Sequence, residues 1–149
     1  EQAPAHTIFM KEHEGTKTML TNGILNAQLA SVLAELRHKD LFVVSDCGLP
    51  VPDGVETIDL ALVFGVPRFE DVLKSLKPEL VLEEGTMAEE AKGGVAEQWV
   101  KDYYDVPLSY VPHDGAGGFK DRVRNAKFVI RTGETTSYAN VIFRCGVPF

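Results

Sequence analysis

A chain of 149 residues is long enough for one domain around a single hydrophobic core. Its 22 acidic residues outnumber the 15 basic ones, and the net charge of -7 argues against binding to nucleic acid, which attracts clustered Lys and Arg. Cys47 and Cys145 form no CxxC pair and no histidines have metal-ligand spacing, so we expect no disulfide scaffold, no zinc site and a reducing cytoplasm.

Nothing in the chain resembles a membrane segment, because no apolar run approaches the ~20 residues of a span. The start, from Glu1 to His13, also lacks the charged and then apolar order of a signal peptide. We therefore predict a soluble protein with no membrane partner. The first methionine is Met10, and the residues before it are left out of the predicted fold.

The first predicted helix begins after Leu25, with Asn26 as its candidate N-cap. Apolar residues then recur at helical spacing, at Leu29, Val32, Leu33 and Leu36. A short apolar run, residues 41–44, follows this helix and is typical of a strand buried on both faces.

Helix and strand signals alternate along the rest of the chain. Pro67 suits the first turn of a helix that Pro78 ends, and Thr86 followed by acidic residues suits the start of another, which two glycines interrupt. A short helix is predicted over residues 119–125. Further strands are predicted over residues 57–63, 80–82, 108–111, 128–131 and 140–144.

Strands separated by helices predict an α/β fold with a largely parallel sheet covered on both faces. The expected architecture is a single three-layer α/β/α domain with a largely parallel, mixed central sheet. Ligands of such sheets bind near the carboxyl ends of the strands, so side chains at these ends are the first candidates for a site.

Three residues at the predicted ends of elements are candidates for chemistry. Asp46 directly follows the first strand, His113 follows the strand 108–111, and His38 stands at the end of the first helix. Each has a structural alternative: an Asx turn for Asp46, an exposed loop for His113 and a helix-capping imidazolium for His38. Spacing alone leaves these alternatives open.

Residues 133–142 gather small polar groups, a phenol and a carboxamide at the start of the last predicted strand. Tyr138 and Asn140 are two positions apart, so in extended backbone they share one face while Ala139 faces away. Both could then grip one polyol ligand. The structural alternatives are a Tyr packed at a strand edge and an Asn that closes a turn.

The order of these motifs resembles the RbsD/FucU family of sugar mutarotases over about residues 23–149. The motifs are His38-Lys39-Asp40, Asp46-Cys47-Gly48-Leu49-Pro50, Gly65-Val66-Pro67 and Tyr138-Ala139-Asn140. Residues 23–149 are then a sugar mutarotase domain and residues 1–22 an N-terminal extension. Two features depart from the family pattern: Arg37 replaces a usual glycine, and residues 115–117 look inserted.

By that resemblance the proton-donating catalytic residue is His38, and the sugar-binding residues are Asp46, His113, Tyr138, Ala139 and Asn140. Ala139 favours the branch of the family that acts on D-ribose. The implied activity interconverts the pyranose and furanose forms of D-ribose by general acid-base ring opening and closing, with no metal or organic cofactor. Histidine suits this chemistry, because its ordinary pKa of ~6.5 lets it give and take protons near neutral pH.

The resemblance leaves two other functions open. One is a mutarotase of another aldose, such as L-fucose, and the other is a non-catalytic monosaccharide-binding or regulatory module, which Arg37 and the insertion at 115–117 would favour. The resemblance also implies a homo-oligomer, a decamer of two pentamers with sites shared between subunits. The apolar terminus, residues 147–149, fits burial in such an assembly.

Overall fold

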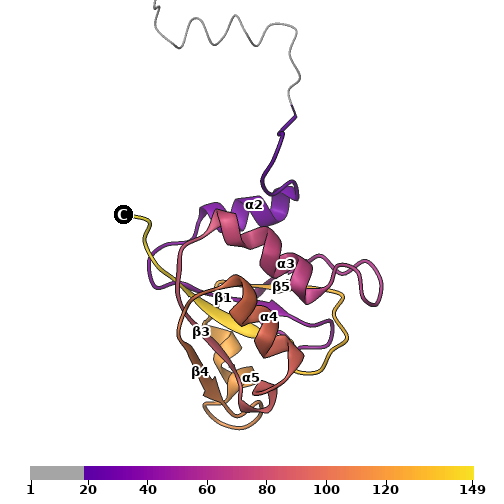
Figure 1. Ribbon diagram of the computed structural model, residues 1–149, viewed down its shortest axis with the longest axis vertical. Helices are drawn as coiled ribbons and strands as arrows, with labels where there is room; N and C mark the ends of the chain where they lie inside the picture. Colours follow the sequence, from indigo (N-terminus) through magenta and orange to yellow (C-terminus); the bar gives the residue numbers. More distant parts are fainter. Residues whose placement is uncertain (1–18) are drawn as a thin grey trace, which may run out of the picture.

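The computed structural model describes residues 19–149, which fold around one six-stranded sheet (Figure 1). Residues 1–18 of the predicted extension lie outside the described part. In space the strands follow the order β2-β5-β1-β6-β3-β4. Their bounds are β1 Leu41–Ser45, β2 Glu56–Asp59, β3 Leu82–Ala88, β4 Leu108–Val111, β5 Phe128–Arg131 and β6 Val141–Cys145.

The predicted, largely parallel mixed sheet is confirmed. β5 pairs in parallel with β1 and with β2, and β3 pairs in parallel with β4. Only β6 runs the other way, antiparallel to its neighbours β1 and β3. Val44 near the end of β1 therefore pairs with Val141 at the start of β6. The start of β6 lies at the sheet edge where the other five strands end.

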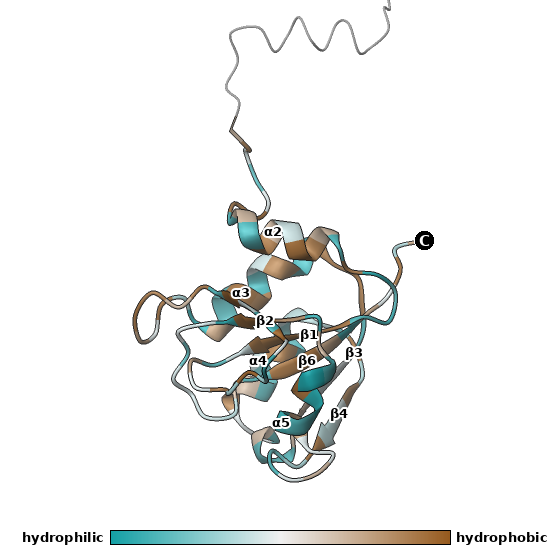
Figure 2. Cartoon of the chain, turned by 180° about the vertical axis from the view of Figure 1, so that it is seen from behind, coloured by the Kyte–Doolittle hydropathy of each residue, from teal (hydrophilic) through white to brown (hydrophobic). Residues whose placement is uncertain are grey.

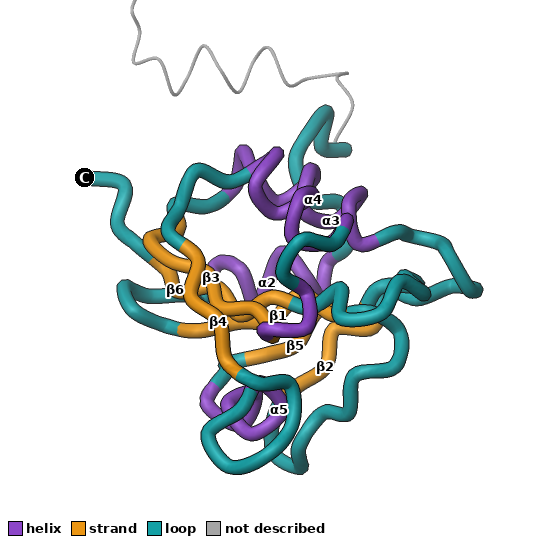
Figure 3. The backbone as a smooth tube through the Cα atoms, turned by 60° about the horizontal axis from the view of Figure 1, so that its bottom comes forward, coloured by secondary structure: helices purple, strands orange, loops and turns teal. Residues whose placement is uncertain are grey.

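Helices cover the sheet on both faces, which confirms the three-layer architecture. One layer holds three helices, and the other holds one short helix continued by a 3₁₀ turn at Val123–Asn125 (Figures 1 and 3). The first layer consists of α2 Ala27–Ala34, α3 Phe69–Leu76 and α4 Val95–Tyr103, and the second of α5 Phe119–Arg122.

Two hydrophobic clusters fill the spaces between these layers. Phe42 and Val44 of β1 point into the cluster under α2, α3 and α4, while Val43 points into the smaller cluster under α5. Because side chains alternate along a strand, an apolar run of this kind must be buried on both faces. The prediction made from residues 41–44 is confirmed.

The helix starts follow local hydrogen bonding. The predicted N-cap is confirmed, because the Asn26 side chain accepts the Leu29 N–H at 2.9 Å. α3 begins at Phe69, two residues later than the start predicted at Pro67, and the N–H of its N-cap Arg68 donates to the Asp71 carboxylate at 2.9 Å. Among the helices of residues 19–149, none has the length and apolar character needed to cross a bilayer.

The helix predicted to open at Thr86 is wrong. Thr86 lies in β3, where it pairs with Ile142 of β6 and with Ser109 of β4. Pairing on both sides outweighs the weak strand propensity of this acidic, glycine-containing segment. The helix expected here begins only after the two glycines, as α4. The strand predicted over 57–63 is also too long, since β2 ends at Asp59.

Candidate functional site

A cavity of about 430 Å³ opens at the sheet edge where the parallel strands end. Its walls are the turn after β1, the loop after β4 and the segment that joins β5 to β6. Four of the six residues predicted to form the site line it: Asp46, His113, Tyr138 and Asn140. The fold thus brings together side chains that are far apart in the sequence.

Asp46 and Asn140 hold each other in place. The Asp46 N–H donates to Asn140 Oδ1 at 2.8 Å, and Asn140 Nδ2 donates to Asp46 Oδ2 at 3.2 Å. The other carboxylate oxygen accepts the Gly48 N–H at 3.0 Å, so the Asx turn weighed for Asp46 is present together with its place in the cavity. Asn140 is 2% exposed, and burial of a carboxamide is tolerated because it is hydrogen-bonded.

His113 and Tyr138 form an aromatic corner of the cavity. Their ring centroids are 5.0 Å apart with the planes at 82°, and Phe119 stacks on the same imidazole with its centroid at 6.1 Å. The Nδ1 atom of His113 is buried and has no hydrogen-bond partner among residues 19–149. An unpaired buried imidazole nitrogen is unusual, because buried polar groups are nearly always hydrogen-bonded.

Tyr138 and Asn140 both border the cavity, but not through extended backbone as predicted. Tyr138 has φ 61°, a left-handed conformation, and its carbonyl accepts the Asn140 N–H at 2.9 Å. The segment is therefore a tight turn, and β6 begins one residue later. Ala139 is fully buried and packs in the core under the helices, so its side chain does not line the cavity.

His38 lies at the opposite edge of the sheet. It precedes β1 in a turn beyond the end of α2, so it does not cap that helix. Its Nε2 atom is 3.1 Å from Glu83 Oε1 near the start of β3. The hydrogen bond from Arg144 keeps the pKa of Glu83 below its ordinary value against desolvation, with help from His38 and Lys39. Within one chain, His38 and the cavity are separate.

Two charged residues of the cavity escaped the sequence analysis as site candidates, Glu134 and Lys120. Glu134 is 2% exposed and follows β5 by three residues. Lys120 lies on α5, and its ammonium group pairs with Asp114 at 2.9 Å, which lowers the pKa of that carboxyl group. Glu134 belongs to the polar run 133–142, but nothing in the local sequence marks this one carboxylate as buried.

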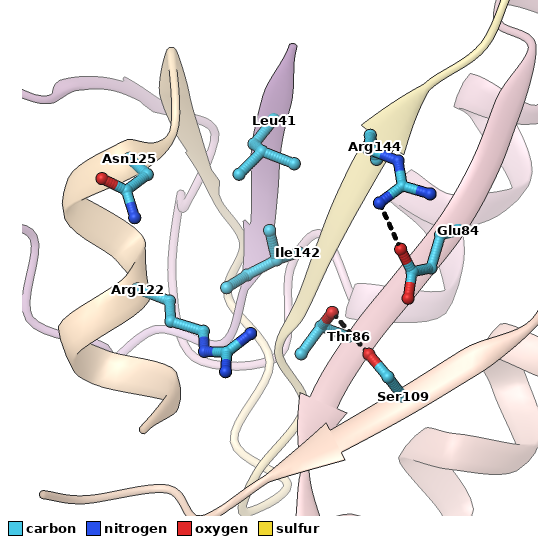
Figure 4. Close-up of a pocket in the computed structure, with 8 residues that line it drawn as sticks. All are labelled: Leu41, Glu84, Thr86, Ser109, Arg122, Asn125, Ile142 and Arg144. Carbon is cyan, nitrogen blue, oxygen red and sulfur yellow. Dashed lines mark hydrogen bonds and ion pairs between the residues drawn. The ribbon is translucent and has the colours of Figure 1, made fainter. Parts of the chain in front are cut away.

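A second hollow of about 250 Å³ lies between α5 and the strands β6, β3 and β4 (Figure 4). None of the predicted site residues lines it. Its polar groups largely satisfy one another, since Arg144 pairs with Glu84 at 2.6 Å and Thr86 bonds to Ser109 at 2.9 Å. The cavity beside Asp46 is therefore the better candidate.

The groups that line the cavity suit a polyol. Asp46 offers a carboxylate, His113 an imidazole, Tyr138 a phenol, Asn140 a carboxamide and Lys120 an ammonium. Together they supply donors and acceptors for several hydroxyl groups. Across residues 19–149, no three His, Cys, Asp or Glu side chains are grouped to hold a metal ion.

Comparison with curated proteins identifies relatives along nearly the whole chain. A D-ribose pyranase of Corynebacterium glutamicum is 48% identical over 131 residues, which are 88% of this chain and 100% of the relative. A D-ribose pyranase of Cutibacterium acnes is 46% identical over the same shares of the two chains.

Solved structures agree with these relatives. The structure of Bacillus subtilis RbsD complexed with D-ribose superposes with a TM-score of 0.81 at 42% identity, covering 88% of this chain and 100% of that one. A fucose mutarotase from Streptococcus pneumoniae shares the fold, with a TM-score of 0.69 at 21% identity over 90% of this chain and 100% of that one. The RbsD / FucU transport protein family matches residues 19–148. The chain belongs to the RbsD/FucU family.

Proposed function

We propose that the protein is a D-ribose pyranase, an isomerase that interconverts the pyranose and furanose forms of D-ribose. The observation that carries this proposal is a polyol-sized cavity lined by Asp46, His113, Tyr138 and Asn140 in a chain 48% identical to a D-ribose pyranase. Two free cysteines, Cys47 and Cys145, are consistent with a cytoplasmic location, which is part of the proposal.

The reaction needs proton transfer at two oxygen atoms. Ring opening moves a proton onto the ring oxygen while the anomeric hydroxyl loses one, and closure through a different hydroxyl reverses this. We assign proton donation to His38. Asp46, His113, Tyr138 and Asn140 fix the sugar hydroxyls, with the backbone at Ala139 beside them. Each lost buried hydrogen bond would cost ~1–3 kcal/mol.

His38 can act on a sugar in the cavity only if a second copy of the chain supplies it. β1 lies between His38 and Asp46, and its five residues span about 16 Å. A head-to-tail contact would place the His38 edge of one subunit against the cavity edge of the next. We propose such a homo-oligomer, a decamer with sites shared between subunits.

Apolar groups at both edges support this contact. An apolar loop, residues 62–66, projects between β2 and α3 and is brown in Figure 2, with Leu62 78% and Phe64 83% exposed. The loop is held firmly, because the Gly65 N–H donates to the Gly133 carbonyl at 2.6 Å. At the other edge, Phe149 is fully exposed. Exposed apolar patches of this kind mark interfaces.

The apolar loop also adjoins the sugar cavity. Cys47 borders both the cavity and a hollow lined by Leu62, Val63 and Phe64. The C-terminal tail leaves the sheet beside His38, since the Lys39 N–H donates to the Cys145 carbonyl at 2.9 Å. A subunit whose tail covers the apolar loop would therefore bring His38 toward the cavity of its neighbour.

Arg37 does not block this role for His38. Its guanidinium Nη1 donates to the carbonyls of Ala34 and Leu36, at 3.4 and 3.2 Å, at the end of the preceding helix. The side chain thus stays on the helix and leaves the imidazole free to contact Glu83. This argues against a binding module that has lost turnover through Arg37.

Exchange NMR on D-ribose, with L-fucose in parallel, tests the function. The wild-type protein is expected to accelerate pyranose-furanose exchange of D-ribose, and His38→Ala to lower that rate by ~10²–10⁴-fold while staying folded, because it removes the proton donor. Lys39→Ala is the matched control, since Lys39 pairs with the same Glu83 at 3.6 Å and should keep full activity.

Three results would change the assignment. Full activity of His38→Ala would remove this residue from the mechanism. Acceleration for L-fucose alone would keep the chemistry and change the substrate to another aldose. Saturable binding of D-ribose without exchange would indicate a sugar-binding or regulatory module.

A further inference from the structure

Glu134 is a buried carboxylate that the proton-transfer scheme does not use. Its side chain is 3% exposed, although it borders the sugar cavity. An ionised carboxylate is expensive to bury unless its oxygens accept several hydrogen bonds. Its partners therefore show what the residue does.

Glu134 bonds to two separate parts of the chain. One is the start of α3, where Arg68 donates from Nε at 3.3 Å and Nη2 at 3.4 Å, and the Phe69 N–H donates at 3.0 Å. The other is the segment of the cavity wall beyond it, where Thr136 donates from its N–H at 3.2 Å and its hydroxyl at 2.8 Å.

The main chain of Glu134 adds a third connection. Its carbonyl accepts the Cys47 N–H at 3.0 Å, so it holds the turn that follows Asp46. Its N–H donates to Thr132 Oγ1 at 3.1 Å, which fixes it to the end of β5. Two of the three walls of the cavity and the start of α3 thus meet at one residue.

We propose that Glu134 is a positioning residue, whose carboxylate holds the wall segment 135–140, with Tyr138 and Asn140, in the conformation that binds the sugar. This inference rests on the proposed sugar chemistry of the cavity. Thr136 is two positions before Tyr138, so its two bonds to Glu134 fix the entry to the tight turn at 138–140. Without them, the segment that leads into this turn would lose its connection to Glu134.

The ionisation of Glu134 agrees with this role. Burial alone would raise the pKa of Glu134, but hydrogen bonds from Thr136, the Phe69 N–H and Arg68 outweigh it and leave the pKa below its ordinary value. The carboxylate is therefore charged at neutral pH and accepts all these bonds at once. A neutral carboxamide of the same shape cannot, because its nitrogen would face one of the donors.

The test compares Glu134→Gln with Glu97→Gln. Glu97 is also buried, at 8% exposure, and accepts the Gly93 N–H, but it does not line the cavity. Both substitutions are expected to lower stability. Only Glu134→Gln is expected to raise KM for D-ribose, by ~10-fold, and to speed amide hydrogen exchange over residues 135–140.

Two outcomes overturn the proposal: unchanged KM and amide exchange in Glu134→Gln, or equal changes in both variants. If Glu134→Gln does not fold, Thr136→Val replaces it, because it removes only the hydroxyl donor at 2.8 Å. A wild-type protein inactive on every aldose would sink the proposed function instead. Amide exchange would then still decide whether Glu134 holds the wall segment.

Discussion

Asn140 illustrates how much a single buried side chain does at this site. It accepts the Asp46 N–H at 2.8 Å and donates to the Asp46 carboxylate at 3.2 Å, so it links the start of β6 to the turn after β1. It also lines the cavity. One carboxamide therefore both fixes the position of Asp46 and lines the cavity.

Asn140→Ala is expected to weaken sugar binding and folding together. It leaves the half-buried Asp46 N–H without its acceptor, which costs up to ~1–3 kcal/mol, and it removes one of the donors to the Asp46 carboxylate. We expect a higher KM for D-ribose in exchange NMR and a lower midpoint in urea. Asn26→Ala is the matched control, because it removes the N-cap of α2, far from the cavity, and should lower stability alone. An unchanged KM in Asn140→Ala would contradict this reading.

Four of the six site residues that the family resemblance implied line the cavity, but the sequence did not indicate how they are held. Asp46 follows a buried strand, and this local signal located it. The sequence around Glu134 gave no comparable signal, since a glutamate in a polar turn is expected to be exposed to solvent. Its burial depends on Arg68 and Phe69, 66 and 65 positions away, and contacts at that separation exist only in the fold.

At the scale of elements, a glutamate joins α4 to β4. Tyr110 of β4 donates its hydroxyl to Glu97 of α4, and the Gly93 N–H donates to the same carboxylate at 3.0 Å. The Tyr110 hydroxyl is the main cause that keeps the pKa of Glu97 below its ordinary value of 4.5. Burial and the same bond raise the pKa of Tyr110 to about 12.

Tyr110→Phe is therefore expected to reduce the loss of folding stability that occurs when the pH is lowered into the acid range. A carboxyl group with a lowered pKa adds stability that is complete above pH 4.5 and is lost as pH falls through the folded-state pKa. Without the hydroxyl, that pKa rises toward its ordinary value and less stability is left to lose. The urea midpoints of the wild type and of Tyr110→Phe are measured at neutral pH and in acid below pH 4.5. The fall in midpoint between the two pH values should be smaller in the variant.

Tyr104→Phe is the matched control, since the Tyr104 hydroxyl donates to the Leu73 carbonyl at 2.7 Å and meets no carboxylate. It should lower stability equally at both pH values. If Tyr110→Phe keeps the full wild-type difference between the two pH values, Glu97 does not contribute in the way described.

The elements themselves were predicted best where local pattern and tertiary pairing agree. α2 has apolar spacing and an N-cap, and β1 has a continuous apolar run, so both were expected. β3 contains Glu83, Glu84 and Gly85, which are poor strand formers, and it forms because β6 and β4 pair with it on both sides. Both partner strands are 23 or more positions away in the chain, so the sequence of β3 alone does not indicate that they pair with it.

At the scale of the whole molecule, the direction of β6 explains both where the cavity lies and why His38 lies outside it within one chain. β6 runs against the other strands, so Asn140 at its start reaches the edge where Asp46 lies. Its end carries Arg144 to the opposite edge, where Glu83 joins it to His38 by bonds of 2.6 and 3.1 Å. The same strand thus separates the proposed donor from the proposed binding site.

Mixing two inactive variants distinguishes a shared site from one built within a chain. His38→Ala keeps an intact cavity, and Asp46→Asn keeps an intact histidine. If each site takes its cavity from one subunit and its histidine from the next, random assembly of equal amounts gives about a quarter of the sites one intact cavity and one intact histidine. Co-refolded mixtures are expected to recover about that fraction of the wild-type exchange rate on D-ribose.

The recovered activity has to depend on assembly. Each variant refolded alone should stay inactive, and the two variants mixed without refolding should gain activity only as fast as subunits exchange. Gel filtration of the wild type is expected to give a mass of several chains. A mass of one chain, or no recovery in co-refolded oligomers, would mean that His38 and Asp46 never meet across subunits, and His113 would then be the one imidazole that the described chain places in the cavity.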